Sequence, residues 1–214
     1  MNSTKFSKYL EISPIEANKI EMAILFLLNA AFEKNKQIYK MHIFKFLSFL
    51  EWTAAKEFSN HFFLLDFTAW ENGPVPYSFM KYIDENNGTF SYFTYKKLNK
   101  ENENDPLKTL FSFKSTSPTY FKDYFNWKYF SDKEKKLLYK ATEWILSFKT
   151  TKELSNDSHK KMKSWELAWN KAVSENKKNE FFDFSYEIGI SKTDEEYDHI
   201  QKIYKISGKQ KNGL

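Results

Sequence analysis

The chain encodes helices more strongly than any other structure. Ser13 with Glu16, and Ser131 with Glu134, form two capping boxes, in which a hydroxyl precedes the helix and a carboxylate follows three residues later. An apolar run with spacings of three and four residues follows each box. The same spacing occurs in residues 40–58, without a capping box. These patterns predict long helices over residues 14–32, 40–58 and 131–148.

The rest of the chain predicts shorter elements. Thr151 and Ser164 are the expected N-caps of two short helices, and Pro76 is the expected start of another. Alternating residues predict two strands joined by a polar loop. The expected short helices cover residues 76–88, 153–160, 164–172 and 193–206; the expected strands cover 89–98 and 110–114; extended segments are expected at 62–70 and 181–190. The predicted fold class is mainly α with a small antiparallel β-hairpin (α+β), in a compact multi-helix domain.

Length and composition fit one compact domain with additions. The chain has 214 residues, of which 41% are hydrophobic and 29% charged, a balance typical of globular proteins. We expect an N-terminal lead over residues 1–12, the main domain over 13–180, and an aromatic segment, a helix and a basic tail over 181–214. The 22 Phe, 13 Tyr and 6 Trp are unusually many. Most of these rings are expected in the core, because exposed rings in such numbers promote aggregation.

Composition excludes several kinds of site. The absence of Cys excludes disulfides, thiolate metal sites and Cys nucleophiles, and five Gly without a GxGxxG or GxxxxGK[ST] motif cannot form a phosphate cradle. None of the His residues forms an i, i+4 metal-binding pair. They are His42, His61, His159 and His199, and each is expected to be structural. We therefore predict no catalytic residue, no metal and no cofactor.

Hydropathy predicts a cytoplasmic protein without a membrane partner. No apolar run approaches the roughly 18 residues of a membrane span, and the first residues carry no secretory pattern.

The positive charge is concentrated at the end of the chain. The formal net charge is +5, and residues 201–214 contain four Lys and no acid, so that the remainder is nearly neutral. All 33 residues counted as Lys or Arg are Lys, which removes the bidentate Arg contact that reads guanine. Nucleic acid is therefore not expected to be the main partner, although a nucleic-acid-binding regulator stays open as an alternative.

Two further constellations have distinctive spacing. Between Trp70 and Tyr77, Gly73 permits a positive φ while the two prolines fix theirs, so that a stiff turn is predicted, which Val75 can anchor to the core. Later in the chain, His159 and Trp165 lie at the adjoining ends of two predicted short helices. A structural role, in the turn and in helix docking, is the favoured interpretation of both.

Together with the second predicted helix, these constellations resemble the Panacea domain, the family of SocA-like antitoxins. The helical segment that starts at Lys45 is similar to the family's KLLYFA motif, although Ser48 stands where the family has an aromatic residue. The matching residues of all three motifs are Lys45, Trp70, Gly73, Pro74, Val75, Leu154, Ser158, His159 and Trp165. The resemblance spans residues 19–169. It implies that the main domain predicted above, residues 13–180, is a Panacea domain.

The resemblance implies a role in a toxin–antitoxin system. Family members neutralise a toxin encoded beside them, by direct protein contact or by delivery to a protease, and some are of phage or prophage origin. The implied partner is a cognate toxin, with a protease or chaperone as a further partner. The main alternative is a nucleic-acid-binding regulatory protein of phage or prophage origin. An enzyme, in which His159 and carboxylates would converge in a pocket, is the less favoured alternative.

Overall fold

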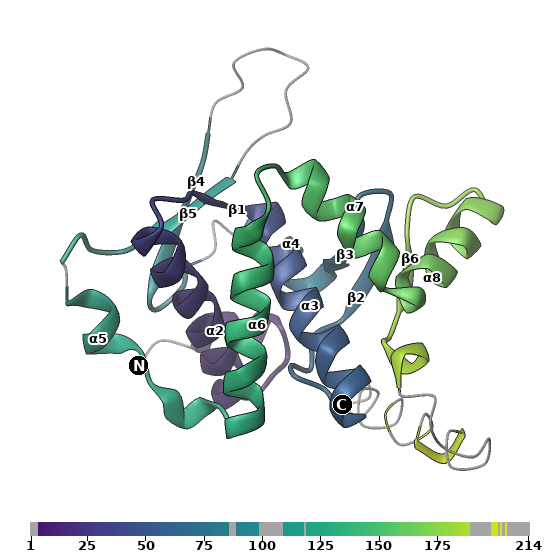
Figure 1. The fold of residues 1–214 in the computed structure, drawn as a ribbon, viewed down its shortest axis with the longest axis horizontal. Helices are drawn as coiled ribbons and strands as arrows, with labels where there is room; N and C mark the ends of the chain where they lie inside the picture. Colours follow the sequence, from purple (N-terminus) through teal and green to yellow (C-terminus); the bar gives the residue numbers. More distant parts are fainter. Residues whose placement is uncertain are drawn as a thin grey trace.

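The protein combines α-helices with two small antiparallel sheets (Figure 1). The computed structural model describes residues 4–85, 89–98, 109–117, 119–188, 198–200, 202 and 204. Within them the structure is mainly helical, which confirms the predicted α+β fold class. No helix in the described part is both long and apolar enough to cross a membrane.

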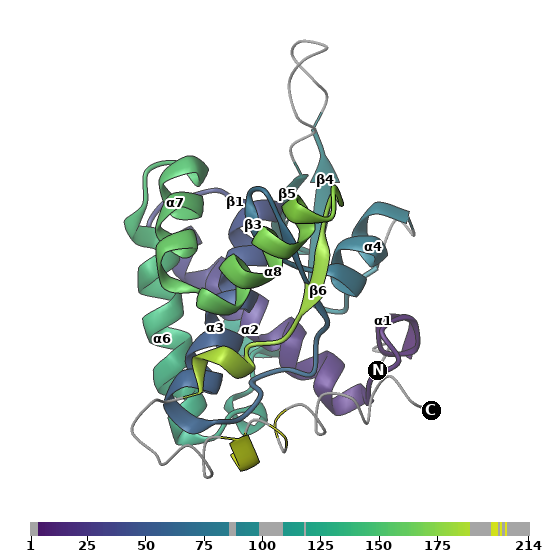
Figure 2. The same ribbon diagram turned by 90° about the vertical axis from the view of Figure 1, so that its right-hand side faces the viewer.

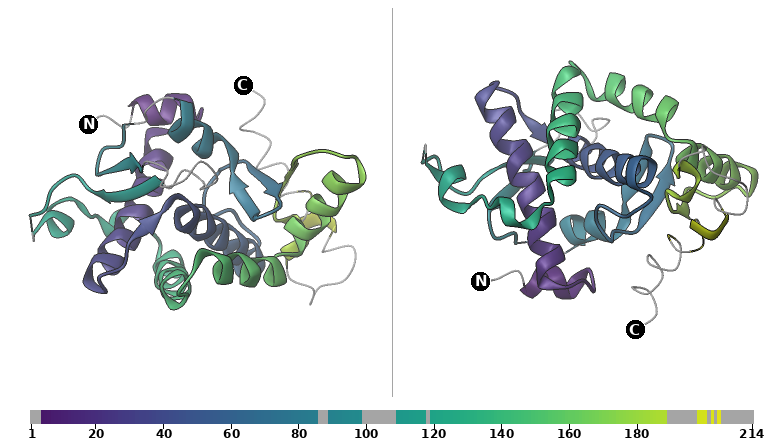
Figure 3. Two further views of the ribbon diagram at one scale, coloured as in Figure 1. Left: turned by 90° about the horizontal axis from the view of Figure 1, so that it is seen from above. Right: turned by 60° about the horizontal axis from the view of Figure 1, so that its bottom comes forward.

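Two helices, α2 (Pro14–Glu33) and α3 (Lys40–Phe58), form the centre of the fold. Residues 20–28 of α2 and 43–55 of α3 are buried on every side. This burial follows from their sequences, in which apolar residues occur on all sides of the helix and not along one stripe, with a few buried polar residues among them. Seen from above, α3 lies between the two sheets (Figure 3, left).

The other helices surround this pair. The helix α6 (Asp132–Ser147) packs on both α2 and α3. It leads into α7 (Thr151–Lys161) and α8 (Lys163–Ser174), and α8 packs on the second sheet (Figure 2). The other helical segments up to residue 188 are α1 (Thr4–Tyr9), α4 (Tyr77–Glu85), α5 (Tyr120–Tyr124) and the 3-10 turns η1 (Trp127–Tyr129) and η2 (Ser185–Glu187).

The first sheet contains the predicted hairpin. Its strand order is β1 (Ile38–Tyr39), β5 (Thr109–Phe113) and β4 (Phe93–Lys97). Phe93 pairs with Phe113 at one end of the hairpin and Lys97 with Thr109 at the other, in antiparallel register. The hairpin prediction is therefore confirmed, while its polar connection lies outside the described residues.

A second sheet joins parts of the chain that are far apart in sequence. Its order is β3 (Gly73–Pro76), β2 (Phe67–Trp70) and β6 (Glu180–Phe182). The chain does turn after Trp70, at Glu71 and Asn72, but the turn is followed by the strand β3 and not directly by a helix. Two prolines fit there because β3 is an edge strand, where missing N–H donors leave no ladder bond unmade.

Several helix and strand boundaries differ from the predictions. The hydroxyls of Ser13 and Ser131 accept from the N–H groups of Glu16 and Glu134, as expected. The box is complete at Ser131, where the Glu134 carboxylate also accepts from the Ser131 N–H at 2.8 Å, but at Ser13 only the hydroxyl bond forms. Thr150, and not Thr151, caps α7, because its backbone is extended and its hydroxyl accepts from Glu153 N–H at 3.2 Å.

Ser164 is likewise not a cap. Met162 is the N-cap of α8, and Ser164 lies inside the first turn, where its N–H donates to Glu187 Oε1 at 2.7 Å. Asp198–Ile200, Lys202 and Tyr204 are helical, but the predicted start of this last helix lies outside the described residues. The domain boundaries stay a prediction.

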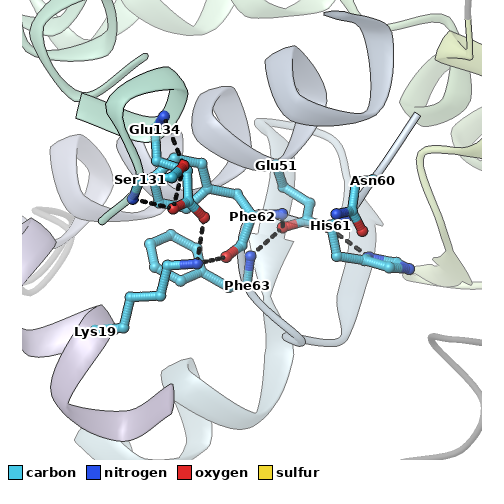
Figure 4. A network of polar contacts seen from close by, with 8 residues as sticks. All are labelled: Lys19, Glu51, Asn60, His61, Phe62, Phe63, Ser131 and Glu134. Carbon is cyan, nitrogen blue, oxygen red and sulfur yellow. Dashed lines mark hydrogen bonds and ion pairs between the residues drawn. The ribbon is translucent and has the colours of Figure 1, made fainter. Parts of the chain in front are cut away.

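Buried polar groups fix the segment between α3 and β2 (Figure 4). The Glu51 carboxylate accepts from the N–H groups of Phe62 at 3.0 Å and Phe63 at 2.7 Å. Lys19 Nζ donates to the Phe62 carbonyl at 2.8 Å and pairs with Glu134 at 2.5 Å. These side chains occupy backbone groups of residues 62 and 63 that a sheet would need, so the predicted extended segment becomes a strand only from residue 67.

Candidate functional site

The motif segments meet around Gly73 at the start of β3. This glycine has φ +103°, a conformation that residues with a side chain rarely adopt. A Cβ at this position would lie 1.8 Å from Lys45 Nζ and 3.0 Å from His159 Nε2. Glycine is therefore required both by the backbone conformation and by the close approach of two side chains from α3 and α7.

Lys45 is the buried cation of this cluster. Its side chain is 0% exposed, and Nζ donates to the Asn72 carbonyl at 2.5 Å. It makes no ion pair with any of the described residues. Burial lowers the pKa of Lys45 from 10.5 to about 7, because the charged form loses its hydration. Near neutral pH the amine is thus divided between its charged and neutral forms.

His159 covers the other side of Gly73. Its ring stacks on Trp165, with centroids 4.0 Å apart and planes within 12°. Burial and then the charge of Lys45 lower its pKa, against the opposing effect of the Asn72 carbonyl. Its Nε2 is buried and makes no hydrogen bond of ordinary geometry within the described residues. The imidazole is therefore neutral at physiological pH.

One indole N–H connects α8 to the second sheet, and another makes a hydrogen bond within β2. Trp165 Nε1 on α8 donates to the Trp70 carbonyl at 3.0 Å, and Trp70 Nε1 donates to Thr68 Oγ1 at 2.9 Å. Glu71 and Asn72, between the paired residues Trp70 and Gly73, are exposed. The cluster thus holds a two-residue turn at the surface while its own side chains stay inside.

The remaining motif residues support this cluster. Pro74 and Val75 continue β3 and are buried, and Leu154 and Ser158 lie on the buried face of α7. Ser158 Oγ donates to the Ser155 carbonyl at 2.7 Å. Ser48, which departs from the family pattern, donates its hydroxyl to the Phe44 carbonyl at 2.8 Å within α3. The structure therefore brings all three motifs together, in direct contact or on adjacent turns.

Sequence reasoning missed Glu51 as a structural centre. Its carboxylate is 2.6 Å from His61 Nδ1 and accepts from the Tyr204 hydroxyl at 3.2 Å, and the His61 ring stacks on Tyr204. Burial opposes protonation of His61, but the hydrogen bond and charge of Glu51 outweigh it and raise the His61 pKa. The sequence signal for this role was an acid within an apolar helical segment. No sequence pattern indicated that His61 and Tyr204 would be its partners.

Glu21 is a second buried acid, in α2. It accepts from the N–H groups of Ser91 at 2.5 Å and Tyr92 at 3.3 Å, and so fixes the segment before β4. Burial raises the Glu21 pKa from 4.5 to about 7, although these hydrogen bonds lower it in part. No group of three or more His, Asp or Glu that could hold a metal occurs among the residues that the structure describes.

The fold and the buried cluster define a small α+β protein whose motif residues build a scaffold. The family model for the SocA-like antitoxin, Panacea domain, matches residues 43–166, from α3 into α8. The match covers more than half of the chain and includes every motif residue named above. The chain belongs to the SocA-like antitoxin family with a Panacea domain. Comparison with curated proteins and with solved structures gives no match.

Proposed function

We propose that this protein is an antitoxin that neutralises a cognate toxin, encoded beside its own gene, by direct contact. The observation that carries the proposal is the burial of the family's motif residues against one another. Lys45 binds a backbone carbonyl, and His159 stacks on Trp165. These side chains support the turn before Gly73 and the junction between α7 and α8. We therefore expect the toxin to contact the exposed residues around them.

Exposed apolar side chains are available on neighbouring elements. Those on α8, β6 and η2, which pack against one another, are Leu167, Val173, Phe181 and Tyr186. Phe181 is 58% exposed and contacts the ring of Tyr77. A few aromatic anchors supply most of the binding energy in typical protein interfaces, and this part of the surface can supply such anchors.

This proposal assigns no enzymatic role to the buried cluster. Lys45 and His159 have lowered pKa values, which a catalytic site also requires. Burial is the largest cause of both shifts, and the same two side chains have a structural role beside Gly73. The protein is accordingly proposed to be a binding protein of the cytoplasm, and nucleic acid is not proposed as its partner.

Co-expression tests the proposal. The reading frame beside the gene is expressed alone and together with the full-length chain, in a normal host and in one that lacks its ATP-dependent cytoplasmic proteases. We expect growth arrest by the neighbour alone, rescue by the chain in both hosts, and co-purification of the two proteins. A neighbour that is harmless, or one that is toxic but not neutralised by the chain, contradicts the proposal. Rescue only in the host that has the proteases would show that the chain acts by delivering the toxin to a protease and not by direct contact.

A matched pair of variants locates the contact. Phe181→Ser removes an exposed ring from β6, and Tyr124→Ser removes one from α5, where the side chain is 50% exposed. We expect Phe181→Ser to weaken co-purification with the toxin and Tyr124→Ser to leave it unchanged. Equal effects of the two substitutions would exclude β6 as the contact.

A further inference from the structure

A cavity of about 490 Å³ lies between the segment before α3 and the C-terminal end of α6. It is open to solvent, and its volume is within the range of small-molecule sites. Its wall is lined by Lys36, Gln37, His42 and Lys149 together with apolar side chains such as Ile38 and Phe148, and none of the lining residues is an acid. The cavity therefore combines an apolar surface with uncompensated positive charge.

Neither lysine of this wall is neutralised by a carboxylate of the described residues. Lys36 Nζ donates to the Leu146 carbonyl near the end of α6, and Lys149 is exposed with no ion pair in the described part. The nearby Glu153 carboxylate instead accepts from the backbone N–H groups of Lys149 at 3.1 Å and Thr150 at 3.3 Å, where it completes the cap of α7.

His42 adds a third donor in a defined tautomer. Its Nδ1 accepts from the Tyr39 N–H at 3.0 Å at the start of α3, which places the proton of the neutral ring on Nε2. Burial and the charge of Lys36 lower the His42 pKa to about 4, so that the ring is neutral at pH 7. The Nε2–H has no acceptor among the described residues and belongs to a side chain that lines the cavity.

The cavity adjoins the scaffold described above. His42 precedes Lys45 by one turn of α3, and Lys149 lies just before α7, which carries His159. The start of α3, which also carries Lys45, thus forms one wall of the cavity, and the end of α6 with the residues that lead into α7 forms the other. A partner that binds here contacts the antitoxin beside its family motif without touching the buried cluster itself.

We propose that this cavity binds a carboxylate side chain, flanked by an apolar residue, from an acidic segment of the cognate toxin. Two ammonium groups and an imidazole N–H provide donors for the carboxylate, and the apolar wall receives its neighbour. Apolar side chains such as Ile38 and Phe148 lie beside the lysines and give a contact that a phosphate backbone would leave unused, so that a peptide suits the cavity better than a nucleic acid. The toxin as the source of this segment rests on the proposed function.

A titration of the full-length chain tests the cavity without the toxin. The probe is the peptide acetyl-Glu-Leu-Glu-amide, and the controls are acetyl-Gln-Leu-Gln-amide, inorganic phosphate and single-stranded DNA. We expect saturable NMR shifts of the His42 ring and the Lys149 amide with the acidic peptide, weakened by added salt. An equal response to the Gln peptide, or tighter binding of phosphate or DNA, overturns the proposal.

Substitutions locate the binding. Lys149→Glu is expected to raise the Kd of the acidic peptide at least about fivefold, the scale of one exposed charge pair. Lys122→Glu makes the same change of charge at an exposed position of α5 outside the cavity, and is expected to leave the Kd unchanged. An unchanged Kd in Lys149→Glu, or an equal loss in Lys122→Glu, overturns the assignment.

His42→Asn provides an independent check, since its amide oxygen can still accept from Tyr39 N–H while the Nε2–H donor is lost. We expect weaker peptide binding at an unchanged Tm; full binding by this variant would remove His42 from the site.

The titration also separates the two proposals. Peptide binding without toxin neutralisation leaves the cavity valid and overturns only the toxin as the source of its ligand, whereas neutralisation without peptide binding overturns the cavity alone.

Discussion

The Lys45 ammonium occupies the space that a side chain at position 73 would fill. The Cβ position of Gly73 lies 1.8 Å from Lys45 Nζ, and the same Nζ donates to the carbonyl of the preceding residue, Asn72. A lysine from a central helix and a glycine from an edge strand are therefore one structural unit. These two motif residues stand far apart in sequence but belong together, because Lys45 fits here only where residue 73 has no side chain.

This relationship predicts strong coupling between the two positions. Gly73→Ala imposes an unfavourable φ and a clash with Nζ, and should lower the free energy of unfolding by about 2–4 kcal/mol. Lys45→Met removes the ammonium, so that the double variant should be more stable than the sum of the single effects by about 1 kcal/mol or more. Urea denaturation measures the double-mutant cycle, and strictly additive effects would contradict the contact.

Lys45 also predicts a pH dependence of stability. Its pKa is about 7 in the folded protein against 10.5 unfolded, so that the folded state binds the proton more weakly. This contribution to stability is complete above pH 10.5 and is lost as the pH falls towards 7, by up to about 1.4 kcal/mol per pH unit. Denaturation between pH 7.5 and 9.5 should show a rise for the wild type that Lys45→Met lacks, and parallel curves would refute the assignment.

Glu21 predicts the opposite slope in a lower pH range. Its pKa is about 7 in the folded protein against 4.5 unfolded, so that the folded state binds the proton more tightly. The resulting stabilisation is complete below pH 4.5 and is lost as the pH rises to 7. Glu21→Gln keeps an acceptor for the Ser91 N–H and should flatten the stability curve between pH 5 and 7. A wild-type slope in this variant would show that other groups cause it.

The cap of α7 can be tested with two adjacent threonines. Thr150 accepts the Glu153 N–H, whereas Thr151 is exposed inside the first turn. Thr150→Ala should lower the free energy of unfolding by about 1 kcal/mol, and Thr151→Ala should change it by only a few tenths. Thermal and urea denaturation distinguish them, and a larger loss for Thr151→Ala would reverse the assignment.

The long helices and the hairpin could be predicted because their signals are local. The N-cap residues Ser13 and Ser131 mark the start of two helices, and the apolar spacing that follows predicts their length. The motif residues could be named from the family resemblance, and all of them lie within the matched region.

The second sheet could not be predicted, since its signals are long-range. The sequence from Gly73 to Pro76 fits a turn as well as an edge strand, and β6 pairs with β2 from more than a hundred residues away. The same holds for Asn72, which contributes a backbone carbonyl, and for Glu51, whose partner Tyr204 lies near the end of the chain. Backbone acceptors and distant partners leave no pattern in a single sequence.

The most direct test of the proposed scaffold compares a buried and an exposed substitution in toxin binding. Lys45→Met and Phe181→Ser are purified at a temperature at which both are folded, and the Kd for the toxin is measured by calorimetry with the Tm of each. We expect Lys45→Met to change the Tm but not the Kd, and Phe181→Ser to raise the Kd at least about tenfold, or about 1.4 kcal/mol, at an unchanged Tm. A folded Lys45→Met variant that no longer binds the toxin would contradict the scaffold role of the motif.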